Sequence, residues 1–96
     1  MSALDTLQFE WDEEKNEINK KKHGIDFNTA IHVFDDEDRL EIYDVEHSAD
    51  EDRYNTIGRV YDILFVVYTA RGEKVRLISA RLASAAERRL YYDYNS

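Results

Sequence analysis

The 96-residue sequence contains no cysteine and no proline, and only three glycines. Without cysteine there can be no disulfide framework, no thiolate metal site and no thiol nucleophile. The longest apolar run, residues 63–68, is far too short to span a membrane, and the first residues lack the pattern of a secretory signal. Glycine-rich phosphate loops, nucleophile elbows and His-Glu-x-x-His zinc motifs are absent too. We therefore expect a cytoplasmic protein outside the common nucleotide-binding and hydrolase classes.

Basic residues are also scarce, because 13 Lys and Arg stand against 21 Asp and Glu, giving a net charge of −8. A charge of this sign, spread evenly, would oppose binding to nucleic acid. The distribution is uneven, however: residues 1–52 hold five basic and 17 acidic residues, whereas residues 53–96 hold eight basic and four acidic ones. The second half can form a local positive surface, and the acidic first half suits a basic partner.

The length and the 43% apolar fraction are typical of one packed domain, here residues 1–96, with residues 1–8 expected to be a flexible leader. Periodicity and β-branched residues predict strands over residues 7–11, 40–45, 54–61, 63–69 and 75–82. Helices are predicted over residues 12–22, 26–34 and 85–94. This order indicates an α+β fold with two N-terminal helices, a four- to five-stranded antiparallel sheet and a C-terminal helix.

Capping residues mark the ends of these predicted helices. Asp12 precedes an acidic first turn, and Gly24 follows a basic last turn, so both ends complement the helix dipole. Asp26 can cap the second helix, and the pair of Ser84 and Glu87 has the spacing of a capping box before the third.

Lys22 and His23 stand at the end of the first predicted helix. A histidine there is explained by the helix dipole alone, and the lysines before it by a solvated helix end. The second interpretation is a proton-transfer group, because histidine titrates near pH 6.5 and can act as an acid or a base.

Arg76, Ser79 and Arg81 stand in the last predicted strand. Alternation predicts that Ser79 and Arg81 share one face, while Arg76 shares the other with Ile78 and Ala80, unless a bulge intervenes. Two interpretations of the arginines are left open by the sequence: they bind an anion, or they pair with the many carboxylates upstream.

His47 lies in a predicted acidic loop close to Asp44 and Glu51. The spacing of these residues fits no recognised metal-ligand pattern, so we interpret the segment as a solvated loop. His32, beside the apolar stripe of the second helix, is interpreted as a boundary residue. No metal and no cofactor is expected.

Three blocks of residues, in order and at matching separations, resemble the BrnT toxin family of bacterial type II toxin–antitoxin systems. The first comprises Phe9-Glu10-Trp11-Asp12, Lys15, Asn19, Lys22-His23-Gly24, Phe27 and Ala30. The second comprises Asp44, His47-Ser48, Glu51, Arg53 and Gly58. The third comprises Thr69, Arg71-Gly72, Arg76, Ile78-Ser79-Ala80-Arg81, Ala83, Glu87 and Arg88.

This resemblance implies a RelE-like fold and a ribonuclease that inhibits translation. It also implies neutralisation by a BrnA-like ribbon-helix-helix antitoxin, through which alone the toxin would be linked to DNA. No membrane partner is expected.

The chemistry we expect is metal-independent cleavage of RNA, in which the ribose 2′-OH attacks the adjacent phosphate. The candidate catalytic residues are Lys22, His23, Arg53, Arg76 and Arg81. The candidate substrate-binding residues are Arg71, Ser79 and Arg88, and Glu51 is a further candidate for the base. The alternative functions are a non-catalytic module whose acidic surface holds a basic partner, and an RNA-binding domain without catalysis.

Overall fold

The computed structural model describes residues 6–96. The predicted leader falls mostly on residues 1–5, which lie outside the described residues. Its last residues are part of the fold, because Leu7 packs against the hydrophobic core and Gln8 begins the first strand. In the part of the chain that the structure describes, no helix is both long and apolar enough to cross a membrane.

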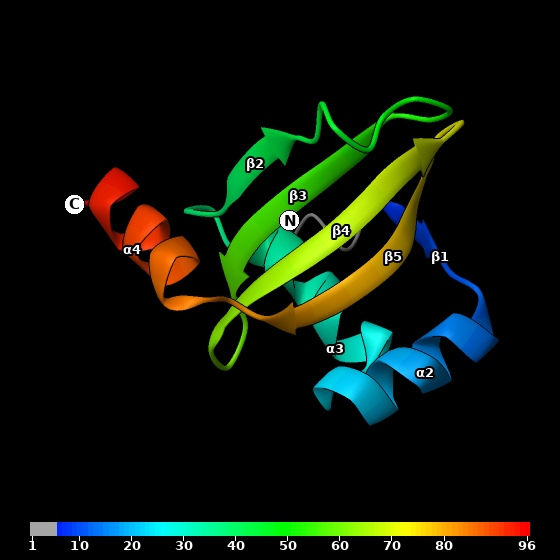
Figure 1. The fold of residues 1–96 in the computed structure, drawn as a ribbon, viewed down its shortest axis with the longest axis horizontal. Coiled ribbons are helices and arrows are strands. Elements are labelled where there is room, and N and C mark those ends of the chain that lie inside the picture. Colours follow the sequence, from blue (N-terminus) through cyan, green and yellow to red (C-terminus); the bar gives the residue numbers. More distant parts are fainter. Residues whose placement is uncertain (1–5) are drawn as a thin grey trace.

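A five-stranded sheet organises the molecule, with the strand order β1-β5-β4-β3-β2 (Figure 1). The strands are β1 (Gln8–Glu10), β2 (Leu40–Tyr43), β3 (Arg53–Arg59), β4 (Ile63–Arg71) and β5 (Lys74–Leu82). The helices are α2 (Glu13–His23), α3 (Phe27–Ala30), the 3-10 helix η1 (Ile31–Asp35) and α4 (Ala85–Tyr94). The predicted α+β class, with two helices before the sheet and one after it, is confirmed.

The expectation of a purely antiparallel sheet is wrong at one edge, because β1 pairs with β5 in parallel. β2, β3, β4 and β5 are connected by short segments and pair antiparallel, as the hairpin signals predict. β1 and β2 lie at opposite edges of the sheet. Between these two strands the chain forms α2 and α3, which pack against the sheet (Figure 1). Such a crossover leaves no local turn signal in the sequence.

The helix boundaries follow from the caps. The Asp12 carboxylate accepts the N–H of Glu14 and of Lys15, and Gly24 ends α2 at a φ of 71°, which only glycine adopts without strain. The capping box of Ser84 and Glu87 is present at the start of α4. The second predicted helix is shorter as an α-helix than expected, because the chain tightens into the 3-10 helix η1 at Ile31.

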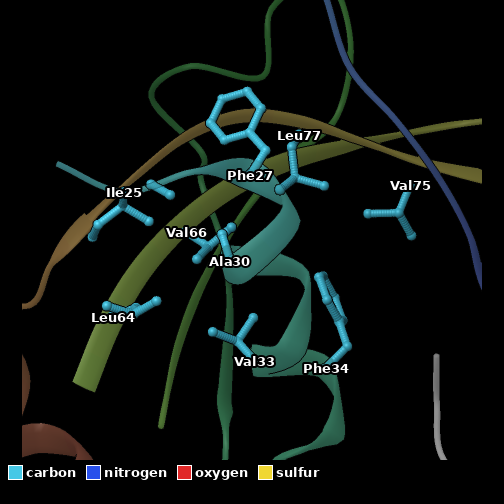
Figure 2. Close-up of a cluster of buried hydrophobic side chains, with 10 residues drawn as sticks. Ile25, Phe27, Ala30, Val33, Phe34, Leu64, Val66, Val75 and Leu77 are labelled. Carbon is cyan, nitrogen blue, oxygen red and sulfur yellow. The ribbon is translucent and has the colours of Figure 1, made fainter. Parts of the chain in front are cut away.

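The larger hydrophobic core lies between α3 and η1 and one face of the sheet. Phe27, Ala30 and Val33 project toward Val66 and Leu77 of the central strands, and all five are almost completely buried (Figure 2). Gly58 permits this contact, because a Cβ atom there would lie 3.2 Å from the Cβ atom of Val33.

The opposite face of the sheet is only half covered. Its smaller cluster, Ile57, Ile63 and Tyr91, is buried beneath α4 at one end of the sheet. Toward the other end no helix of residues 6–96 covers it: Val67 remains partly exposed, whereas its neighbour Val66, on the helix-covered face, is completely buried. This uncovered half is called the open face below.

A β-bulge in β5 changes which side chains reach the open face. Val67 pairs with Ser79 but Tyr68 pairs with Leu77, so Ile78 is an extra residue in the strand. Arg76 and Ser79 consequently lie opposite Thr69 and Val67, which alternate on one face of β4.

The predicted separation of Arg76 from Ser79 and Arg81 is therefore wrong. Arg81 pairs with Phe65, which belongs to the same alternating set of β4, so Arg76, Ser79 and Arg81 all share the open face. The extra residue at Ile78 shifts the alternation by one position, which strict period-two reasoning cannot detect.

Candidate functional site

The open face gathers basic side chains in an otherwise acidic protein. By strand register it presents residues from the three central strands, and these are Arg53, Asn55, Val67, Thr69, Arg71, Lys74, Arg76, Ser79 and Arg81. None of these side chains is acidic, and the acidic residues next to them are contributed by β1, α4 and the loop before β3. Five of the eight basic residues of the second half of the sequence thus lie on one surface.

Three of these residues form a row across the sheet. Arg53 of β3 pairs with Thr69 of β4, which pairs with Arg76 of β5. Because neighbouring strands lie about 4.8 Å apart, the Cα atoms of Arg53 and Arg76 are separated by roughly 10 Å. Two guanidinium groups at this separation, on the same side of the sheet, can approach one phosphate group or two successive ones of an extended chain.

The arginines differ in how far their donors are already engaged. Arg76 Nη1 donates to Glu10 Oε2 at 2.7 Å, which leaves further N–H groups of the guanidinium without a partner among residues 6–96. Arg53 forms no salt bridge within the described part of the chain. Arg53 is therefore the guanidinium most available to an external anion.

Arg81 is held more rigidly than the other two. Its guanidinium donates to both carboxylate oxygens of Glu87, at 2.7 Å and 3.0 Å, and lies 4.1 Å from the centre of the Phe65 ring. The hydrogen bond from Arg81 lowers the pKa of Glu87 below its usual value, although burial acts in the opposite direction. This pair therefore fixes the start of α4 on the sheet as well as placing a cation at the edge of the open face.

The depressed pKa of Glu87 predicts a pH-dependent loss of stability. A carboxyl group whose pKa is lowered in the folded state stabilises the fold at pH values above its pKa in the unfolded chain, which is about 4.5. This contribution is lost as the pH falls through the lower pKa of the folded state. Glu87→Gln should therefore be less stable than the parent in urea at pH 7, and the difference should shrink toward pH 3.5. Glu17→Gln, at an exposed position of α2, is the control. A difference that does not change with pH would contradict the assignment.

Lys22 and His23 do not lie among the open-face arginines. They line a hollow of about 190 Å³ between α2 and the free edge of β5, together with Lys15, Asn19 and Ser79. Ser79 belongs both to this hollow and, by its pairing with Val67, to the open face. The structure therefore brings the two predicted basic groups to adjoining surfaces that meet at Ser79.

Asn19 fixes the position of this part of α2. Its side chain accepts the Ala80 N–H at 3.1 Å and donates to the carbonyl oxygens of Ala80 and Ile25, both at 2.9 Å. It thereby gives β5 the hydrogen bonds that a neighbouring strand would otherwise supply where β1 has ended.

The remaining predicted residues are spread over two ends of the sheet. Arg71 lies at the β4–β5 hairpin, where its Nε atom is 3.6 Å from a carboxylate oxygen of Glu51. Arg88 lies on α4 and donates to Asp62 in the turn before β4, which lowers the pKa of that carboxyl group. Arg88 is thus at the opposite end of the sheet from Arg71, outside the row of Arg53 and Arg76.

Two residues near the open face were not singled out by the sequence. Asn55 lies two residues after Arg53 in β3 and pairs with Val67. Strand alternation could have indicated that Asn55 shares a face with Arg53. His47 was interpreted as part of a solvated loop, but its Nδ1 atom lies 2.9 Å from Asp44 Oδ2, and its ring lines a hollow with Arg53 and Arg71. Only the fold brings that loop against the hairpin.

Within residues 6–96, no group of three or more His, Asp or Glu side chains is arranged as metal ligands. The charged side chains that the central strands place on the open face are four arginines and Lys74, and they can bind anions and stabilise developing negative charge.

A family model described as "Ribonuclease toxin, BrnT, of type II toxin-antitoxin system" matches residues 11–87. The chain belongs to the BrnT family. The crystal structure of the ribonuclease toxin BrnT of Brucella abortus has a similar fold, with a TM-score of 0.65 and 28% sequence identity over 81% of this chain and 97% of that chain. No curated protein sequence matches.

Membership of the BrnT family confirms the resemblance that the three sequence blocks indicate. The family is one of ribonuclease toxins, and a type II toxin–antitoxin family implies an antitoxin as partner. The match covers α2, α3, η1, the strands β2 to β5 and the beginning of α4, but not β1, so the residues of the open face all lie within it.

Proposed function

We propose that this BrnT protein is an endoribonuclease that binds RNA across the open face and cleaves it without a metal ion. The 2′-OH attacks the adjacent phosphorus and a P–O bond forms. The bond from phosphorus to the 5′-oxygen then breaks, which yields a 2′,3′-cyclic phosphate and a 5′-hydroxyl. Arg53 and Arg76 carry this proposal: they flank the buried Thr69 from the two neighbouring strands and offer cations where the phosphorane gains negative charge.

In this proposal the predicted site residues have distinct roles. Arg53 and Arg76 stabilise the phosphorane, Arg71 binds the adjoining phosphate, and Arg81 binds RNA at the edge of the face. Ser79 lies where an extended strand would pass from the open face to the hollow of Lys22 and His23. His23 there is a proton donor or acceptor. Arg88 lies on α4 and its guanidinium donates to Asp62, so it would contact only RNA that extends from the open face past α4.

The test of the reaction type is to map the ends of RNA cleaved by the purified protein. We expect 2′,3′-cyclic phosphate and 5′-hydroxyl ends, with a rate unchanged by EDTA. Ends bearing a 3′-hydroxyl and a 5′-phosphate, together with inhibition by EDTA, would instead indicate metal-dependent hydrolysis. If His23→Ala and Arg81→Ala both cleave RNA like the parent, their assigned roles are wrong.

We further propose a BrnA-like ribbon-helix-helix antitoxin as the partner, with DNA bound only through it. The acidic first half of the chain favours a basic partner. A hollow of about 360 Å³ between β2 and α4, lined by Leu40, Ile42, Leu90 and Tyr94 among others, offers apolar contact beside a free strand edge.

Expression in bacteria tests this toxin function and its proposed site of action in the cytoplasm. The chain alone should arrest growth and inhibit translation, and co-expression of the antitoxin should relieve the arrest. Harmless expression combined with tight binding of the partner would favour the non-catalytic module instead.

A further inference from the structure

The loop between β2 and β3 folds against the β4–β5 hairpin at the end of the open face (Figure 1). Together they form a hollow of about 470 Å³, which is lined by His47, Ala49, Asp50, Glu51, Arg53 and Arg71. This is the hollow that contains Arg53, the one arginine of the open face that forms no salt bridge within the described part of the chain. A histidine therefore lies beside the cation best placed to bind a phosphate.

The imidazole of His47 is oriented by Asp44. Nδ1 lies 2.9 Å from Asp44 Oδ2, and the backbone N–H of His47 donates to Asp44 Oδ1 at 3.2 Å. Asp44 is tied to the strand in turn, because its N–H donates to the carbonyl oxygen of Arg53 at 2.9 Å. Ser48 Oγ accepts the Arg53 N–H at 3.0 Å. Asp44 and Ser48, on either side of His47 in the loop, are thus both hydrogen-bonded to the backbone of Arg53.

Asp44 is held in its ionised form. Burial raises the pKa of its carboxyl group, but the hydrogen bonds from the side chain and backbone of His47 outweigh it, so the pKa lies below its usual value. An ionised carboxylate can only accept a hydrogen bond, so in the neutral imidazole the proton lies on Nδ1 and Nδ1–H donates to Asp44 Oδ2. Nε2 is then left with a free lone pair, which is the arrangement of a histidine that acts as a general base.

We propose that His47 is the general base of the ribonuclease site, that Asp44 positions it, and that Arg53 and Arg71 hold the RNA phosphodiester beside it. The inference rests on the proposed function and deepens it. Nε2 removes the proton of the 2′-OH as that oxygen bonds to phosphorus. The 5′-oxygen leaves with the electron pair of its P–O bond and takes a proton from His23, where the strand reaches the hollow beside Ser79, or else from solvent. The imidazolium then returns its proton to solvent.

The charged groups around the imidazole are of both signs. Asp44 is hydrogen-bonded to it, and Asp50 and Glu51 of the loop, Arg53 of β3 and Arg71 of the hairpin line the same hollow. The Nε atom of Arg71 lies 3.6 Å from Glu51, which leaves its terminal N–H groups for the phosphodiester, and Arg53 forms no salt bridge within residues 6–96. A general base acts only in its deprotonated form, so kcat should rise with pH.

The experiment compares the cleavage kinetics of the parent, His47→Gln, Asp44→Asn and His47→Ala on a short RNA. Removing a general base typically costs about 100- to 10,000-fold in rate, so His47→Gln should lose kcat by this factor with little change in KM and should lose the rise of kcat with pH. Asp44→Asn should also lower kcat, because an amide can donate to Nδ1 and favour the wrong tautomer. Added imidazole should restore part of the activity of His47→Ala.

His32→Gln is the matched control, because His32 lies in a separate hollow with Asp35, Asp36 and Arg59. This substitution should leave kcat unchanged. Rescue by imidazole separates loss of the base from loss of the fold. If the parent cleaves RNA but His47→Gln retains the parental kcat and pH profile, the assignment of His47 is wrong while the proposed function stands. If the folded parent cleaves no RNA, the proposed function fails, and this inference fails with it.

Discussion

Arg53→Gln is expected to reduce kcat for RNA cleavage by about 100- to 1,000-fold, which is the usual cost of losing one well-placed charge stabiliser. The fold should be preserved, because the Arg53 guanidinium forms no salt bridge within residues 6–96. Removing it leaves no carboxylate unpaired in that part of the chain. Thermal unfolding and single-turnover cleavage of the same preparation measure both quantities.

The matched control for this variant is Arg89→Gln. Arg89 is an exposed arginine on α4, also without a salt bridge among the described residues, so the same change in net charge is made away from the open face. Arg89→Gln should cleave RNA within a few-fold of the parent. Equal losses in the two variants would mean that the protein attracts RNA through its overall charge rather than through a site at Arg53.

Asn19→Ala should be the most destabilising of the changes considered, by about 2–5 kcal/mol, because buried polar groups left without a partner cost about 1–3 kcal/mol each. The substitution removes the side chain that satisfies the N–H and carbonyl of Ala80 and the carbonyl of Ile25. It also releases the end of α2 that carries Lys22 and His23. A domain of this size is stable by about 5–15 kcal/mol, so the loss is a large fraction of the total.

Urea unfolding at neutral pH measures this loss, and thermal unfolding should show a melting temperature lower by roughly 10 °C or more. Asn28→Ala is the control, because Asn28 is exposed and its side chain donates only to Asp26 in the adjacent cap. A loss below 1 kcal/mol for Asn19→Ala would mean that water replaces the side chain at the free edge of β5.

The sequence predicts the helices and the central strands well, because caps and alternation are local signals. Asp12, Gly24, Asp26 and Ser84 all act where their types and spacing indicate. The parallel pairing of β1 could not be predicted in this way, because it depends on a crossover rather than on a turn. The role of Asn19 as a substitute strand partner is equally hidden, because its partner Ala80 lies 61 residues away.

The candidate site is predictable in its residue types but not in its geometry. Arg53, Arg76 and Arg81 were identified from the sequence, and the bulge at Ile78 is what brings Arg76 to the same face as Arg81. The pairing of His47 with Asp44 is local, yet its significance arises only when the loop lies against the hairpin and Arg53. A charged loop in isolation gives no reason to expect such a hollow.

We expect the open face to bind the phosphodiester backbone of RNA. The most direct test is a titration of the isotope-labelled protein with a short 2′-O-methyl RNA, which cannot be cleaved, followed by amide chemical shifts. We predict salt-sensitive shifts at Arg53, Thr69, Arg76 and Ser79 on the open face. Shifts confined to β2 and α4, or binding that does not weaken with added salt, would contradict the account.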